Sequence, residues 1–123
     1  MNLKIDTKEK FTVISPKVDS PTANMTEEFE KLLLPYLNNA VPHLILNLSG
    51  IDTITEEQAE NIASIQQQFY EKNCSFLVCE MNKKVEDVFE KANLLEVMNI
   101  TPTESEAWDI VQLEEIEREL LDD

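Results

Sequence analysis

The stretch PHLILNLSGIDTITEEQAENIA, residues 42–63, runs from an apolar segment into an acidic helix start and decides the fold. Residues 44–48 are almost continuously apolar, which is typical of a strand buried on both faces of a sheet. The chain's only glycine, Gly50, follows. Over residues 59–69 the apolar side chains recur at helical spacing. A buried strand that passes directly into a helix predicts an α/β domain, in which sites tend to lie at such junctions.

The segments on either side predict further strands and helices. Residues 2–6 and 10–16 alternate polar and apolar side chains, which predicts a β-hairpin. The order of elements is β-β-α-β-α-β-α-β-α, which indicates a mostly parallel, mixed sheet of about five strands with four helices. The other predicted strands cover residues 74–81 and 94–100, and the other predicted helices cover 25–39, 83–94 and 101–123.

Four residues define the ends of the predicted helices more closely. Pro35 falls inside a helical pattern, where proline removes a hydrogen bond, so we expect a bend or a new helix start there. Asn93 suits the left-handed turn that ends a helix. Thr103 and Glu106 have the spacing of a capping box at the start of the last helix. The apolar residues expected along one face of that helix are Ala107, Ile110, Leu113, Ile116 and Leu120.

Length and charge restrict the class of protein. The 123 residues suit one domain spanning 1–123. The net charge of −15 disfavours nucleic acids and anionic membranes, which require Lys and Arg. No apolar run approaches the roughly 20 residues that insertion into a bilayer needs, and residues 1–10 lack the apolar segment of a secretory signal. We therefore expect a cytoplasmic protein.

The two cysteines, Cys74 and Cys79, share one apolar run. Residues five positions apart on a strand point to opposite faces and lie about 16 Å apart, which is too far for a disulfide. We expect two buried free thiols.

The residue combinations of an enzyme site are missing from the sequence. His43 is the only histidine, and a catalytic base needs a nucleophile and an orienting group within reach. A single glycine excludes the glycine-rich loops that bind phosphates. No Cys/His set has the spacing of a metal site. We expect a protein that is not an enzyme and that uses no cofactor or metal.

Three segments in order resemble the STAS domain family, whose SpoIIAA-like members are bacterial anti-sigma factor antagonists. LSGID at residues 48–52 is similar to the family's strand end, and PKVDSPTAN at 16–24 is similar to its preceding turn, GELDHHTAE. Residues 83–108 resemble its helix–strand–helix segment. The resemblance covers nearly the whole chain and implies a single STAS domain with the element order given above.

The resemblance also implies a regulatory role. Unphosphorylated members of the family bind an anti-sigma factor, often a serine kinase, and release a sigma factor that starts transcription. The kinase then phosphorylates a serine at the start of the helix after the buried strand, and the dianion separates the complex. The chain would accordingly bind an anti-sigma factor or a related regulator, in an oligomeric state that is left open. Its expected partner surface contains Asp19, Ser20, Asp52, Thr53, Thr55, Glu56, Glu57 and Asn82.

Glu57 occupies the position of the family's phosphorylated serine and has no hydroxyl group. One explanation for Glu57 is local, because Thr55 and Gln58 fit a capping box and acidic residues in the first turn suit the helix dipole. Together these features stabilise a helix by about 1–2 kcal/mol. Alternatively, its carboxylate imitates phosphoserine with one charge instead of nearly two. Thr53 and Thr55 are alternative acceptor hydroxyls.

Two other functions of a STAS domain stay open. In the first, the domain is a subunit of a lipid-transport ABC complex. In the second, the domain is a sensor that binds a small ligand in a cleft beside the same loop. An ATPase subunit as partner would favour the first, and calorimetric binding of a small molecule would favour the second.

Overall fold

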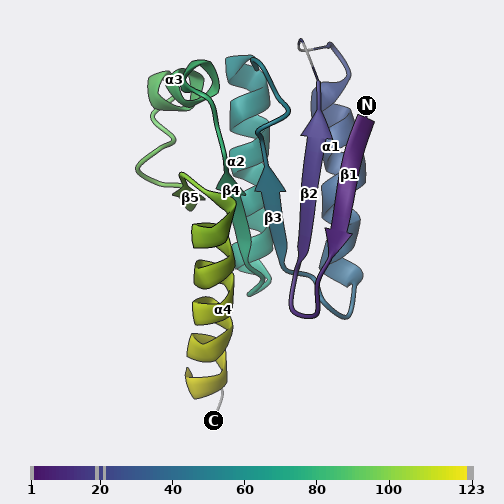
Figure 1. Ribbon diagram of the computed structural model, residues 1–123, viewed down its shortest axis with the longest axis vertical. Helices are drawn as coiled ribbons and strands as arrows, with labels where there is room; N and C mark the ends of the chain where they lie inside the picture. The colour runs from purple at the N-terminus through teal and green to yellow at the C-terminus, as the bar shows by residue number, and fades with distance from the viewer. Residues whose placement is uncertain (1, 19, 21, 122–123) are drawn as a thin grey trace.

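The computed structural model describes residues 2–18, 20 and 22–121, which form one five-stranded sheet with helices on both faces (Figure 1). The sheet order is β1-β2-β3-β4-β5. The strands are β1 Asn2–Thr7, β2 Thr12–Lys17, β3 Leu44–Asn47, β4 Phe76–Cys79 and β5 Ile100–Thr101. The helices are α1 Met25–Leu33, the 3-10 helix η1 Leu34–Asn38, α2 Glu56–Glu71, α3 Lys83–Lys91 and α4 Glu104–Leu121.

The pairing of the strands confirms the predicted sheet. β1 and β2 are antiparallel, and the three remaining pairs are parallel. Parallel neighbours need a crossover helix, and α1, α2 and α3 each connect one such pair. The carboxyl ends of β2, β3 and β4 therefore meet at one edge of the sheet, where α2 and α3 begin (Figure 1).

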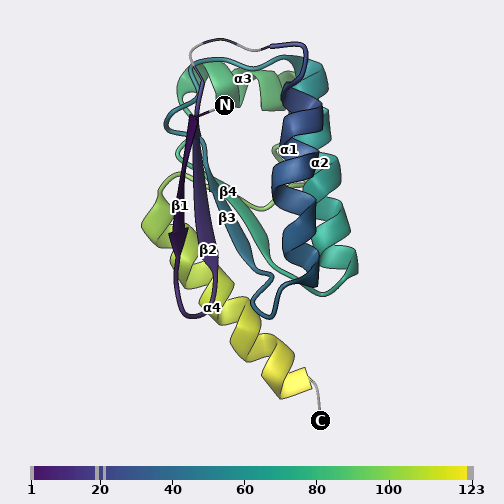
Figure 2. The same cartoon turned by 90° about the vertical axis from the view of Figure 1, so that its right-hand side faces the viewer.

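Helices α1 and α2 cover one face of the sheet and α4 covers the other (Figure 2). The larger core lies under α1 and α2 and contains the fully buried Phe29, Phe69 and Phe89. The smaller core lies under α4, where Ala107 and Val111 pack on the other face of β2, β3 and β4. Burial on both faces explains why the β3 and β4 sequences are continuously apolar.

Local sequence signals placed several helix ends correctly. Pro35 occupies the first turn of η1, so the new helix start expected there is confirmed, as a change from α-helix to 3-10 helix. Asn93 has a φ of 61° and lies just beyond α3, which confirms its left-handed turn. Thr103 Oγ1 accepts a hydrogen bond from Glu106 N at 3.3 Å at the start of α4.

The strand predicted over residues 94–100 was wrong except at its last residue. β5 begins at Ile100, and residues 94–99 form turns. Met98 N donates to Leu94 O at 3.0 Å within this segment, and pairing with β4 begins at its end, where Asn99 O accepts Val78 N at 3.2 Å. Leu94 and Met98 both pack on the larger core, whereas Val97 is 76% exposed.

The apolar face predicted for the last helix is confirmed at Ala107 and Ile110, which pack on the smaller core, and wrong from Leu113 onward. Leu113, Ile116 and Leu120 are 54%, 52% and 73% exposed, while Ala107 and Val111 are buried. The buried face continues from those two residues through Glu114 and Arg118, which are polar and hydrogen-bonded.

A polar cluster at the amino ends of β3 and β4 explains why this face of α4 is turned toward the sheet. Ser75 is fully buried, and its Oγ donates to Glu114 Oε1 at 2.5 Å and accepts from Arg118 Nη2 at 2.7 Å. Tyr70 Oη donates to the same Glu114 carboxylate at 2.9 Å. Because a buried hydroxyl and two partly buried charged groups are costly to leave unpaired, these bonds bring the polar side of α4 inward.

His43 belongs to this cluster and is held in its neutral form. Its Nδ1 accepts the Ser75 N–H at 3.0 Å, so the ring proton lies on Nε2, which contacts Glu115 Oε2 at 3.0 Å. Burial, together with the charge of Arg118, lowers the pKa of His43 despite the opposing effect of Glu115. A second ring proton would break the bond from Ser75.

We therefore expect His43 to make stability depend on pH. Below the unfolded-state pKa of about 6.5, the unfolded chain binds a proton on this ring that the folded chain resists, so stability falls as the pH falls. Urea unfolding at pH 7.5 and 5.5 should show a larger loss for the wild type than for His43→Gln. Equal losses in the two proteins would contradict this assignment of the proton.

Cys74 and Cys79 are buried free thiols. β4 begins at Phe76, so only Cys79 lies in the strand. Burial raises the pKa of Cys79 to about 12, so this thiol stays protonated and unreactive near neutral pH.

Candidate functional site

Gly50 allows the loop between β3 and α2 to lie against the end of β2. Val18 N donates to Gly50 O at 2.9 Å, and Asp52 N donates to Val18 O at 3.3 Å. A Cβ atom at position 50 would come within 2.6 Å of Pro16 O. The chain's single glycine is therefore required for close approach of two backbones.

The start of α2 is fixed by a complete capping box. Gln58 N donates to Thr55 Oγ1 at 3.1 Å, and Thr55 N donates to Gln58 Oε1 at 2.9 Å. This confirms the predicted role of Thr55 and Gln58. Because these two side chains satisfy the cap, Glu56 and Glu57 lie in the first turn as additional, exposed charges.

Gln58 also connects α2 to the segment before α1. Gln58 is only 4% exposed, and its Nε2 donates to Thr22 O at 3.1 Å. A small pocket of about 230 Å³ lies at this contact, and Glu57 is one of its lining residues. Ser20 is exposed nearby in the sequence, and the predicted site residue Asp19 lies outside the described residues.

Asn82 connects α3 to the same loop. Its Oδ1 caps α3 by accepting Val85 N at 2.8 Å, and its Nδ2 donates to Asp52 O at 2.9 Å and Ile51 O at 3.3 Å. Lys84 Nζ lies 3.8 Å from the Asp52 carboxylate. Asn82 thus positions the loop with its whole amide group.

The predicted site residues Asp52, Thr53, Thr55, Glu56, Glu57 and Asn82 meet on one edge of the sheet. Thr53 is half-buried, whereas Asp52, Thr55, Glu56 and Glu57 are exposed. The surface of this edge is built by short, fixed connections and carries carboxylates. We refer to the exposed residues Asp52, Thr55, Glu56, Glu57 and Asn82 as the α2 edge.

The chemistry of the α2 edge suits recognition of another macromolecule. In residues 2–18, 20 and 22–121, no group of three or more His, Cys, Asp or Glu side chains could hold a metal ion. The pocket at Glu57 is small compared with the 300–1,000 Å³ typical of small-molecule sites. An exposed patch on rigid connections is more typical of a protein-binding surface.

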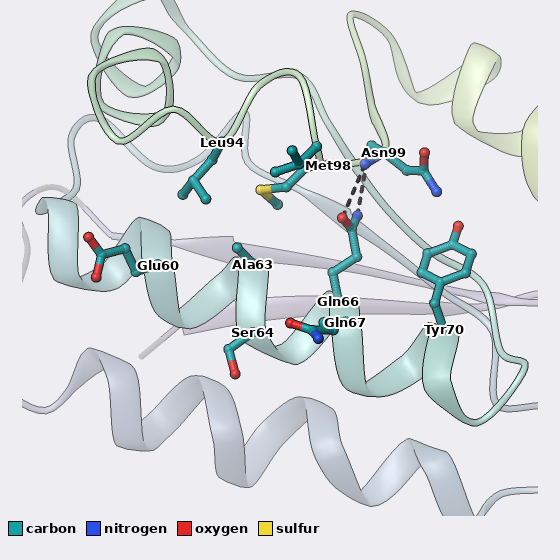
Figure 3. A pocket seen from close by; sticks show the side chains of 10 residues that line it. Glu60, Ala63, Ser64, Gln66, Gln67, Tyr70, Leu94, Met98 and Asn99 are labelled. Atoms are coloured by element: carbon teal, nitrogen blue, oxygen red, sulfur yellow. Dashed lines mark hydrogen bonds between the residues drawn. The ribbon is translucent and has the colours of Figure 1, made fainter.

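A larger pocket, about 540 Å³, lies between α2 and residues 94–99 (Figure 3). Gln66 spans its inner wall, where it accepts Asn99 N at 3.1 Å and donates to Asn99 O at 3.0 Å and Phe76 O at 2.7 Å. Both polar atoms of the Gln66 side chain are therefore hydrogen-bonded within the fold.

Sequence reasoning missed the long-range roles of Gln58 and Gln66. The Thr-x-x-Gln spacing revealed the local bonds of Gln58 but not its bond to Thr22, which lies 36 residues away. Gln66 stands on the apolar side of a helical pattern, next to Ile65 and one turn from Ile62, and a polar residue at such a position was the available signal.

Comparisons with known proteins connect this arrangement to one family. The model of the STAS domain matches residues 4–107. A comparison with curated protein sequences found no match. Among the residues that the structure describes, none of the helices has both the length and the apolar character to cross a membrane.

Solved structures share the fold at low sequence identity. A Thermotoga maritima protein assigned as an anti-sigma factor antagonist has a TM-score of 0.79 and 23% identity, over 89% of this chain and 94% of that one. A serine-to-glutamate variant of RsbS from Moorella thermoacetica has a TM-score of 0.73 and 15% identity, over 91% and 96%. The anti-sigma factor antagonist SpoIIAA, in its unphosphorylated form, has a TM-score of 0.71 and 17% identity, over 90% and 96%.

Proposed function

Since its residues 4–107 match the STAS model, the chain belongs to the STAS domain family, and we propose that it is a regulatory protein of the anti-sigma factor antagonist type. In this proposal residues 1–123 act as one non-catalytic domain in the cytoplasm. The domain binds a protein partner, an anti-sigma factor or a related regulator, through the α2 edge. Asp19, Ser20 and Thr53 complete the contact surface.

The observation that carries the proposal is the position of Glu57 at an exposed helix start whose cap is already complete. Thr55 and Gln58 satisfy each other's backbone N–H groups. Glu57 adds only the interaction of its charge with the helix dipole, which is worth about 0.3–1 kcal/mol at the surface. Its carboxylate thus remains available to act on a bound partner.

Glu57 would act as a permanent negative charge at the partner interface. Asp52 and Glu56 make the α2 edge acidic, with Lys84 beside Asp52 as a nearby cation. A further charge facing a partner without a compensating group weakens binding by repulsion and desolvation. We therefore propose that Glu57 holds the domain in a low-affinity form that a phosphorylated serine would give other members of the family. The RsbS variant shares this fold and carries glutamate in place of a serine, which supports the view that a STAS fold accepts such a substitution.

Affinity capture from the native cell tests the proposed partner class. Tagged wild type and Glu57→Ser should retain the same regulator, with more of it on Glu57→Ser, and mass spectrometry should identify an anti-sigma factor or a related kinase. Glu106→Ser is the matched control, because Glu106 is also an exposed acid in the first turn of a helix.

Other outcomes of the capture would redirect the proposal. Recovery of an ATPase subunit in place of a regulator would favour the lipid-transport complex. Phosphate on Thr53 or Thr55 would show that a neighbouring hydroxyl has replaced the family serine. Retention of a small molecule by the purified chain, measured by calorimetry, would favour a ligand sensor.

A further inference from the structure

The outward face of α4 carries a row of exposed apolar side chains. Leu113, Ile116 and Leu120 are 54%, 52% and 73% exposed, on the side of the helix opposite the buried Ala107 and Val111. We call these three residues the α4 row. The end of α4 extends beyond the sheet, which leaves this part of the helix open to a neighbour (Figure 2).

The row is held in this orientation by the polar cluster on the inner side of the helix. Arg118 donates to Ser75 Oγ at 2.7 Å and Glu114 accepts from both Ser75 and Tyr70. Rotating α4 to bury the row would break all of these bonds and expose Val111. The apolar side chains therefore stay in water until another surface covers them.

The spacing of the row matches a helix–helix seam. Positions i, i+3 and i+7 correspond to an a–d–a segment of a heptad repeat, about 10 Å long. In this register the flanking e and g positions are occupied by Glu117 and Glu119, both exposed. Flanking charges of this kind decide which helices pair.

We propose that the α4 row binds an amphipathic helix of a partner protein whose apolar seam is bordered by lysine or arginine. The acidic flanks are complementary to such a helix and repel a second copy of this chain, which would place Glu117 and Glu119 against the same residues. The net charge of −15 adds to that repulsion. This surface does not include the α2 edge, so it does not depend on the role of Glu57.

A pair of synthetic helical peptides tests the proposal on the full chain. One peptide carries leucine at the a and d positions and lysine at e and g, and the other carries glutamate in place of lysine. The lysine peptide should bind at least tenfold more tightly than the glutamate peptide, and nuclear magnetic resonance shifts should fall on residues 109–121. Shifts elsewhere, or equal affinity for the two peptides, would overturn the proposal.

Variants of the chain separate the seam from general charge attraction. The double change Leu113→Gln and Ile116→Gln should reduce affinity for the lysine peptide at least fivefold, whereas Val97→Gln, at another exposed apolar residue, should leave it unchanged. The double change Glu117→Lys and Glu119→Lys should reverse the preference between peptides. A preserved preference would refute the proposal. The proposal would also be refuted if the wild type sedimented as a dimer and the double change Leu113→Gln and Ile116→Gln dissociated that dimer.

Discussion

Replacing Gly50 with alanine should lower the free energy of unfolding by about 1–3 kcal/mol, the usual cost of forcing an extra methyl group into a filled space. The new Cβ would lie 2.6 Å from Pro16 O, an atom of the backbone that cannot rotate away. Relief requires the loop to leave the end of β2, which would lengthen the bond from Val18 N to Gly50 O. Urea unfolding measures the loss.

The neighbouring change Ser49→Ala is the control for Gly50→Ala. Ser49 is exposed, and the bond from its backbone N to Asn47 Oδ1 survives the substitution. Its effect should stay within about 0.5 kcal/mol. If Gly50→Ala also stayed within that range, the close approach of the two backbones would not be a structural requirement.

Replacing Gln66 with leucine should cost about 2–4 kcal/mol of stability, although the side chains are similar in size. The amide of Gln66 pairs with Asn99 N, Asn99 O and Phe76 O at a position that is 5% exposed. Leucine would leave Asn99 N and Phe76 O without that partner, at about 1–3 kcal/mol for each unpaired buried group, whereas Asn99 O keeps its bond from Val78 N. Residues 94–99 would lose their attachment to α2 as a result.

Gln67→Leu gives the matched comparison on the same helix. Gln67 is exposed, and its Nε2 donates to Glu71 Oε1 at 3.2 Å on the same helix. Urea unfolding should show a change within about 0.5 kcal/mol for this variant. Equal effects of the two leucine substitutions would contradict the structural role of Gln66.

The parts of the fold that the sequence predicted correctly depend on local signals. The continuous apolar runs of β3 and β4 indicated burial on both faces, and Thr55 with Gln58 indicated where α2 starts. Asn93 indicated where α3 ends. Each of these signals involves residues within a few positions of one another, so a short segment of sequence contains all the interacting residues.

The incorrect predictions involve partners that are distant in the sequence. The face of α4 depends on Ser75, which lies 39 residues before Glu114 and 43 before Arg118. Hydrophobic periodicity assigns the apolar side of a helix to the core and has no means of weighing a buried polar cluster against it. For the same reason, the bond of Asn82 to the backbone of Asp52, 30 residues away, gave no sequence signal.

The proposed site combines both kinds of information. The resemblance to the family segment implies that the switch position falls on Glu57, and the structure supplies the geometry around this residue: a complete cap, a loop fixed by Gly50 and an amide bridge from Asn82. The sequence alone left a helix-stabilising role and a charge-bearing role open for Glu57. The completed cap makes the first role small enough to separate the two by experiment.

The affinity of the captured partner for wild type, Glu57→Ala and Glu106→Ala tests the account most directly. Removing the charge of Glu57 should strengthen binding about fivefold, or ~1 kcal/mol, while Glu106→Ala leaves it unchanged. The affinities can be measured by calorimetry at two salt concentrations, and the difference should shrink at high salt. If Glu57→Ala altered the affinity by less than about 0.5 kcal/mol, Glu57 would be a helix-start residue only and the proposed switch position would be refuted.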